Sequence, residues 1–109
     1  MKYRVGIAAA VLWFPQSIMA QEPGDPRAGS TFAHAHCAEC HAVSAFESKS
    51  PNVKAPTFVS VAKTPGMTGR ALAAWLQTSH PTMPDFLIAQ EDRDNVIAYI
   101  MGLKPVPEQ

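Results

Sequence analysis

The sequence predicts an all-α fold in which short helices form one small domain. Two segments place apolar side chains at helical spacing, and Asp25-Pro26 and Thr68 have the character of helix starts. Ten prolines divide the 109-residue chain into short pieces, and no segment shows the alternation of a half-buried strand. These observations favour short helices joined by proline-rich loops, without strands or internal repeats.

The first 20 residues have the pattern of a secretory signal peptide. A basic start precedes an apolar stretch at 5–14, and Ala20 is a small residue suited to the position before a cleavage site. This stretch is shorter than the roughly 20 residues that span a bilayer, so a permanent anchor is the less favoured alternative. Cleavage after Ala20 leaves one domain, residues 21–109, which we expect in the periplasm.

The first helix of this domain is expected at 26–36. Asp25 can accept a backbone hydrogen bond as its N-cap, and a proline suits the first helical position because its missing N–H is not needed there. The following segment, 42–63, contains two prolines and no sustained period. It is expected to be a loop with one helical turn at 58–62.

Two further helices are expected at 69–78 and 90–101. Thr68 caps the former, and Leu72, Trp75 and Leu76 share one of its faces. The latter begins with acidic residues that suit the helix dipole, but Ala89 stands where a capping side chain is usual. Its apolar stripe consists of Val96, Tyr99, Ile100 and Leu103.

The segment Cys37-Ala38-Glu39-Cys40-His41 is the attachment signature of a c-type haem. In one helical turn, positions 37, 40 and 41 are neighbours, so both sulfurs can bond to the porphyrin edge while the imidazole reaches the iron. The alternatives are a redox dithiol, half of a zinc site and a small disulfide. No βαβ pattern and no second ligand pair support the first two, and a haem would supply the core that so small a domain needs.

The second axial ligand of the iron is expected after His41. Met83 lies between two prolines that stiffen its loop and present its thioether at low entropic cost. His80 is the main alternative and would give a lower potential, while Met67 is a weaker one. Met101 is at a spacing typical of core packing.

The charge of the mature domain restricts its partners. Seven basic and nine acidic residues remain after cleavage, and no basic stripe suggests nucleic acid. Lysines at 49, 54 and 63 are spread through a loop and indicate no steering patch. We therefore expect a monomer that meets the membrane only through its partners.

These motifs resemble those of the small class I bacterial cytochromes c over residues 25–104. The attachment motif lies near the mature N-terminus, Pro56-Thr57-Phe58 follows, and a segment from Trp75 to Pro84 precedes the last helix. The resemblance implies a cytochrome c fold wrapped around one haem c, with the first and last helices crossing at right angles. Gly29 then corresponds to the small residue at that crossing, near Tyr99.

The resemblance also implies roles for individual residues. Cys37 and Cys40 would hold the haem by thioether bonds, and His41 and Met83 would be the axial ligands. The Pro56 carbonyl would accept the Nδ1 proton of His41, although the segment 51–53 is a competing match. Trp75 would bind at the haem edge or a propionate, and a core tryptophan is the alternative.

With both axial positions filled, the iron has no open place for a substrate, so we expect no enzyme activity. The implied function is single-electron transfer in the periplasm, between donor and acceptor proteins that the sequence does not identify. A gas-binding sensor with a displaceable distal ligand and a fixed subunit of a larger oxidoreductase are the alternatives.

Overall fold

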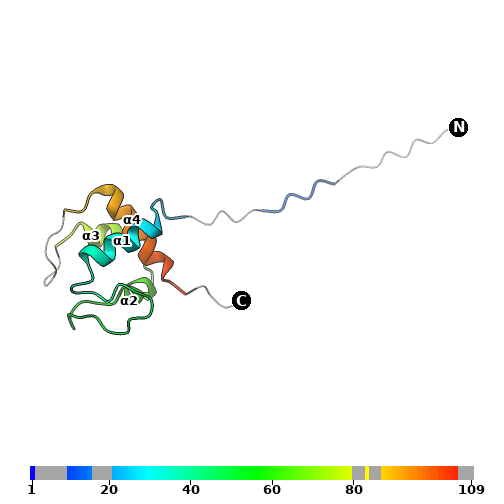
Figure 1. Ribbon diagram of the computed structural model, residues 1–109. Coiled ribbons are helices and arrows are strands. Elements are labelled where there is room, and N and C mark those ends of the chain that lie inside the picture. The colour runs from blue at the N-terminus through cyan, green and yellow to red at the C-terminus, as the bar shows by residue number, and fades with distance from the viewer. Residues whose placement is uncertain (2–9, 16–20, 80–82, 84–86, 106–109) are drawn as a thin grey trace.

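The computed structural model contains four helices, shown in Figure 1: α1 (Pro26–His36), α2 (Phe58–Lys63), α3 (Gly69–Leu76) and α4 (Gln90–Gly102). The structure describes residues 1, 10–15, 21–79, 83 and 87–105. These residues form no β-sheet, so the all-α prediction is confirmed. No helix among them is long and apolar enough to cross a membrane. The expected cleavage site after Ala20 lies outside the described residues.

The helix starts follow the capping side chains. The Asp25 carboxylate accepts the Arg27 N–H at 2.9 Å, and the Thr68 hydroxyl accepts the Ala71 N–H at 3.1 Å. Thr57 caps α2 in the same way through the Ser60 N–H. Each bond satisfies a backbone donor that the first turn of a helix leaves without a partner.

The expected end of α3 was two residues too late. The helix stops at Leu76, where the Gln77 N–H bonds back to the carbonyls of Ala74 and Trp75 and tightens the last turn. The Thr78 hydroxyl donates to the Trp75 carbonyl as well. Local hydrogen bonding therefore ends the helix before the prolines at 81 and 84 could.

Helix α4 begins without a side-chain cap, as its sequence predicts. Ala89 occupies the N-cap position, and its side chain can accept no hydrogen bond. Replacing Ala89 with serine should stabilise the protein by about 1 kcal/mol, because a hydroxyl there satisfies one free N–H of the first turn. Denaturant unfolding followed by circular dichroism measures this, with Ala89→Val as the control that adds bulk and no acceptor.

Helices α1 and α4 pack against each other at close range. Gly29 of α1 is buried, and a Cβ at this position would overlap the Asn95 carbonyl oxygen and lie 2.9 Å from Tyr99 Cβ. The chain before α1 is also tied to α4, since the Asp25 N–H donates to Asn95 Oδ1 at 2.8 Å. The small residue expected at the crossing is therefore where the backbones of α1 and α4 approach most closely.

The core lies where α4 meets the other three helices. Val96 and Ile100 of the expected stripe are buried, but so is Ile97, whereas Tyr99 and Leu103 are only partly buried. Because α1, α2 and α3 all pack against α4, they cover more of its surface than the predicted apolar stripe occupies. The remaining core side chains are Ala33, Val43, Phe58, Ala62 and Leu72.

Candidate haem-binding site

A cavity of about 1000 Å³ opens beside the end of α1. This volume is at the upper limit of about 300–1,000 Å³ that is usual for ligand pockets. All six residues expected at the site line it: Cys37, Cys40, His41, Pro56, Trp75 and Met83. They come from the turn after α1, the loop before α2, α3 and the loop before α4. The fold thus brings residues that are up to 46 positions apart to one apolar space.

The attachment motif continues from α1 as a series of tight turns. The Cys37 N–H donates to Ala33 O at 2.8 Å, so Cys37 closes the helix. The N–H groups of Cys40 and His41 then both donate to the Cys37 carbonyl, at 3.2 and 2.9 Å. This one carbonyl fixes the turn that carries the second cysteine and the histidine to the cavity wall.

Both cysteines are free thiols, and both are half-buried. Burial raises the pKa of the Cys37 thiol to about 11, so it is neutral at physiological pH. A neutral thiol in apolar surroundings is a poor redox nucleophile and a poor zinc ligand, since both roles need the thiolate. In addition, the described residues contain no group of three or more side chains that could hold a metal ion. The raised pKa disfavours Cys37 as the attacking thiolate of a redox dithiol.

The His41 ring is held in one orientation. Its Nδ1 lies 2.7 Å from the Pro56 carbonyl oxygen, and its ring centroid is 5.5 Å from that of Phe58. A carbonyl can only accept, so Nδ1 carries the proton and Nε2 keeps its lone pair. In the competing segment 51–53, the Asn52 N–H donates to the Cys40 carbonyl instead. The imidazole is therefore prepared to ligate a metal through Nε2.

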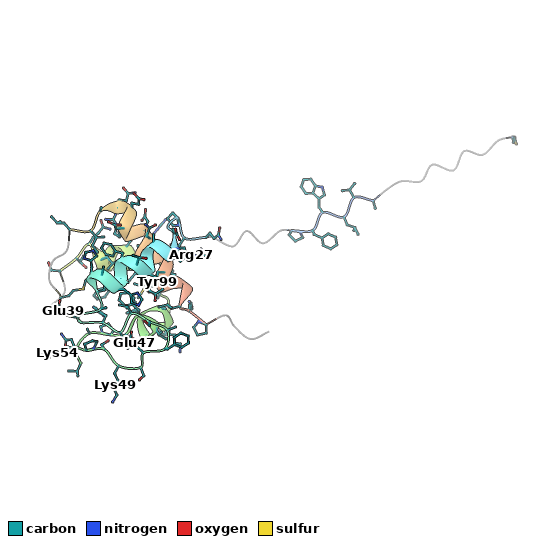
Figure 2. All side chains as sticks on the ribbon, in the orientation of Figure 1. Arg27, Glu39, Glu47, Lys49, Lys54 and Tyr99 are labelled. Carbon is teal, nitrogen blue, oxygen red and sulfur yellow. The ribbon has the colours of Figure 1, made fainter. Side chains whose placement is uncertain are left out.

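Hydrogen bonds from residues distant in the sequence hold the backbone of the segment that follows His41. The Ala42 N–H donates to Ser50 Oγ at 3.0 Å, and the Ala42 carbonyl accepts the Phe58 N–H at 2.9 Å. The Tyr99 hydroxyl of α4 donates to the Val43 carbonyl at 2.7 Å. Figure 2 shows Tyr99 beneath α1, close to this segment. The sequence did not predict these hydrogen bonds, because no local pattern indicates that Ser50 or Tyr99 bonds to this segment.

Three of the four candidates for the second axial position can be located. Met83 is half-buried and lines the cavity. Met67 also lines it and packs against the core, whereas Met101 packs on the core and is absent from the cavity lining. His80 lies outside the described residues.

Trp75 lies on the cavity wall and is 55% exposed, which disfavours its interpretation as a core tryptophan. His34 and His36 are exposed, as the sequence suggests for residues so close to the motif. The His36 ring packs against Phe32 with centroids 4.5 Å apart, and both rings border the cavity.

The residues of this cavity fit a covalently attached haem. The wall is mainly apolar, as a porphyrin face requires, and two reduced thiols lie within four positions of a histidine whose Nε2 keeps its lone pair. A thioether on another loop borders the same space. Thiol, imidazole and thioether are the donor groups that bind or ligate haem in proteins.

Comparison with known proteins gives one similar curated protein. Cytochrome c-552 of Bradyrhizobium diazoefficiens is 31% identical to this chain over 99 residues, which are 91% of this chain and 91% of that protein. No protein-family model matches the chain, and no solved structure matches it either.

Proposed function

Since the chain belongs to the small monohaem class I cytochromes c, we propose that it carries single electrons through the periplasm with His41 and Met83 as axial ligands. Membership of this family makes the protein an electron carrier rather than an enzyme and implies haem c and redox proteins as partners. The axial ligands, the thioether bonds and the compartment are the proposal. The observation that carries it is the convergence of these residues on one apolar cavity.

Each residue of the cavity has a separate task in this proposal. When bound, the haem supplies an iron that accepts and releases one electron. Cys37 and Cys40 hold the haem covalently, so it cannot be lost between encounters. Pro56 orients His41 and makes its Nε2 more basic through the 2.7 Å bond to Nδ1. The soft Met83 thioether and the apolar wall favour the reduced state and raise the potential.

The first 20 residues support the proposed compartment, the periplasm. The contacts of the next five residues support the proposed start of the mature domain. Cleavage after Ala20 would leave Glu22, whose carboxylate lies against Gly69 at the start of α3, and Gly24, which packs on the backbone of Asp94 and Asn95. These contacts support a mature domain of residues 21–109. A monomer that exchanges electrons over small, brief interfaces completes the proposal.

The test is to mature the full chain in a periplasm with its haem. The expected product has the mass of residues 21–109 plus one haem that denaturation does not release. Spectroelectrochemistry should show one reversible electron per chain. A Cys37→Ala/Cys40→Ala variant should carry no covalent haem. Immediate binding of CO to the reduced wild-type protein would instead support the gas-sensor alternative and contradict the carrier proposal.

A further inference from the structure

A second surface, largely separate from the haem cavity, carries a fully exposed aromatic side chain. Phe46 is 99% exposed on the loop before α2, where water surrounds the whole ring. Beside it lies a shallow groove of about 320 Å³, lined among others by Ser48, Val59 and Lys63. Of the residues that line this groove, only Ser60 also lines the haem cavity. We call Phe46, Lys49, Lys63 and this groove the Phe46 surface.

The charges of the domain are unevenly distributed along the chain, although they nearly cancel in number. Residues 42–79 carry four basic side chains and one acidic one, a formal +3. The other described residues of the mature domain, 21–41 and 87–105, carry three basic and six acidic side chains, a formal −3. The second group contains α1 and α4, which pack together at one end of the domain in Figure 1, with α2 at the other. Arg70, however, belongs to α3, which lies with α1 and α4 in Figure 1, and Figure 2 labels Glu39 beside Lys54. The end that holds α2 therefore carries Lys49, Lys54 and Lys63 against Glu39 and Glu47, a small excess of positive charge.

The Phe46 surface lies at the end of the domain that holds α2. Lys49, Lys54 and Lys63 are all exposed, and within the described part of the chain none of them forms an ion pair. Of the two acids at this end, Glu47 also lines the groove, and its Oε2 accepts the Ser44 N–H at 2.9 Å. Figure 2 shows Lys49 and Lys54 projecting from the end of the molecule that is remote from Arg27.

We propose that the Phe46 surface docks on an acidic protein surface that has an apolar pocket for the Phe46 ring. A central aromatic anchor with a charged surround is typical of protein interfaces, where such anchors give most of the affinity and the charges steer the encounter. Because the groove and the haem cavity share only Ser60 among their lining residues, the partner would hold the cytochrome while the cavity mouth stays free. The surface thus serves attachment rather than electron entry.

A protein fits this surface better than an anionic membrane does. Recognition of anionic lipid by charge uses clusters of about four to eight basic residues, and this end has three lysines and two acids. A membrane-surface helix presents a long apolar face, whereas α2 has six residues and buries Phe58 and Ala62 inside the domain. In addition, a groove can receive a partner's side chain, which a bilayer does not offer.

The experiment places the photo-cross-linker benzoylphenylalanine at position 46 of the holoprotein in the cells that produce it, with a second variant at the exposed Ala28 of α1 as the control. Mass spectrometry identifies the adducts. The expected result is a protein adduct at position 46 only, through a partner segment in which acidic residues flank apolar ones. Phospholipid adducts, a second copy of this chain, or no adduct would overturn the proposal.

The partner is then purified, and its affinity for the holoprotein is measured at low salt. Phe46→Ala and Lys49→Glu/Lys63→Glu should each weaken binding tenfold or more, and the charge variant should also reduce the salt dependence. Lys104→Glu, an exposed lysine at the end of α4, is the matched control and should leave the affinity within twofold. Equal affinity of all four proteins would contradict the proposal. All variants should keep the reversible one-electron spectrum, so a failed carrier function would be recognised separately.

Discussion

Replacing Gly29 with alanine is expected to destabilise the holoprotein by about 3 kcal/mol or more, at the upper end of the usual cost of overpacking. The added Cβ would overlap the Asn95 carbonyl oxygen, which belongs to the α4 backbone and cannot rotate away as a side chain could. It would also lie 2.9 Å from Tyr99 Cβ. The two helices must therefore separate, and this exposes the core that α4 shares with α1, α2 and α3. Denaturant unfolding of the mature protein, followed by far-ultraviolet circular dichroism, measures the loss.

A glycine at the end of α4 provides a matched control. A Cβ at Gly102 would have nothing within 4 Å, so Gly102→Ala should be neutral or stabilising by up to about 1 kcal/mol through helix propensity alone. Both substitutions add the same methyl group, but Gly29→Ala should lower the free energy of unfolding and Gly102→Ala should not. If Gly29→Ala were also neutral, the inference that the α1 and α4 backbones approach closely at Gly29 would be wrong.

Replacing Met83 with alanine should abolish the weak charge-transfer band at the red edge of the oxidised spectrum. That band depends on the bond between thioether sulfur and ferric iron, and alanine has no sulfur to form it. The potential should fall, and the reduced protein should bind CO, since one axial position becomes open. Optical spectra of the oxidised and reduced protein, with and without CO, measure all three effects.

The matched variant is His80→Ala, which removes the alternative ligand. It should keep the band, the potential and the insensitivity to CO. If His80→Ala changed the spectrum and Met83→Ala did not, the iron would have two histidine ligands and a lower potential. Met67→Ala is a further control, because Met67 lines the same cavity but packs against the core.

The parts of the structure that follow from local chemistry could be predicted from the sequence. Asp25 and Thr68 mark helix starts, and Ala89 marks a start without a cap, because capping depends on residues within three positions. The haem motif is equally local, since its geometry depends on five consecutive residues. The end of α3 was misplaced because side-chain and backbone bonds near Gln77 compete with the prolines that follow.

The contacts that span many residues could not be predicted in this way. Tyr99 and Val43 are 56 positions apart, and neither has a pattern that indicates a hydrogen bond between them. Positions along the chain likewise do not show that Lys49 and Lys54 project from the end of the molecule that is remote from Arg27, as Figure 2 shows.

The crossing of α1 and α4 also determines when this chain can fold. Asp25 and Asn95 are 70 positions apart, so their hydrogen bond closes nearly the whole domain into one loop. Closing a loop of that length costs about 4 kcal/mol of chain entropy, which must be met before the core is complete. Synthesis begins at the N-terminus, so α1 has no α4 to pack against until the last helix has been synthesised and released. Folding should therefore be a late, all-or-none step, and a chain shortened by α4 should have no native structure to adopt.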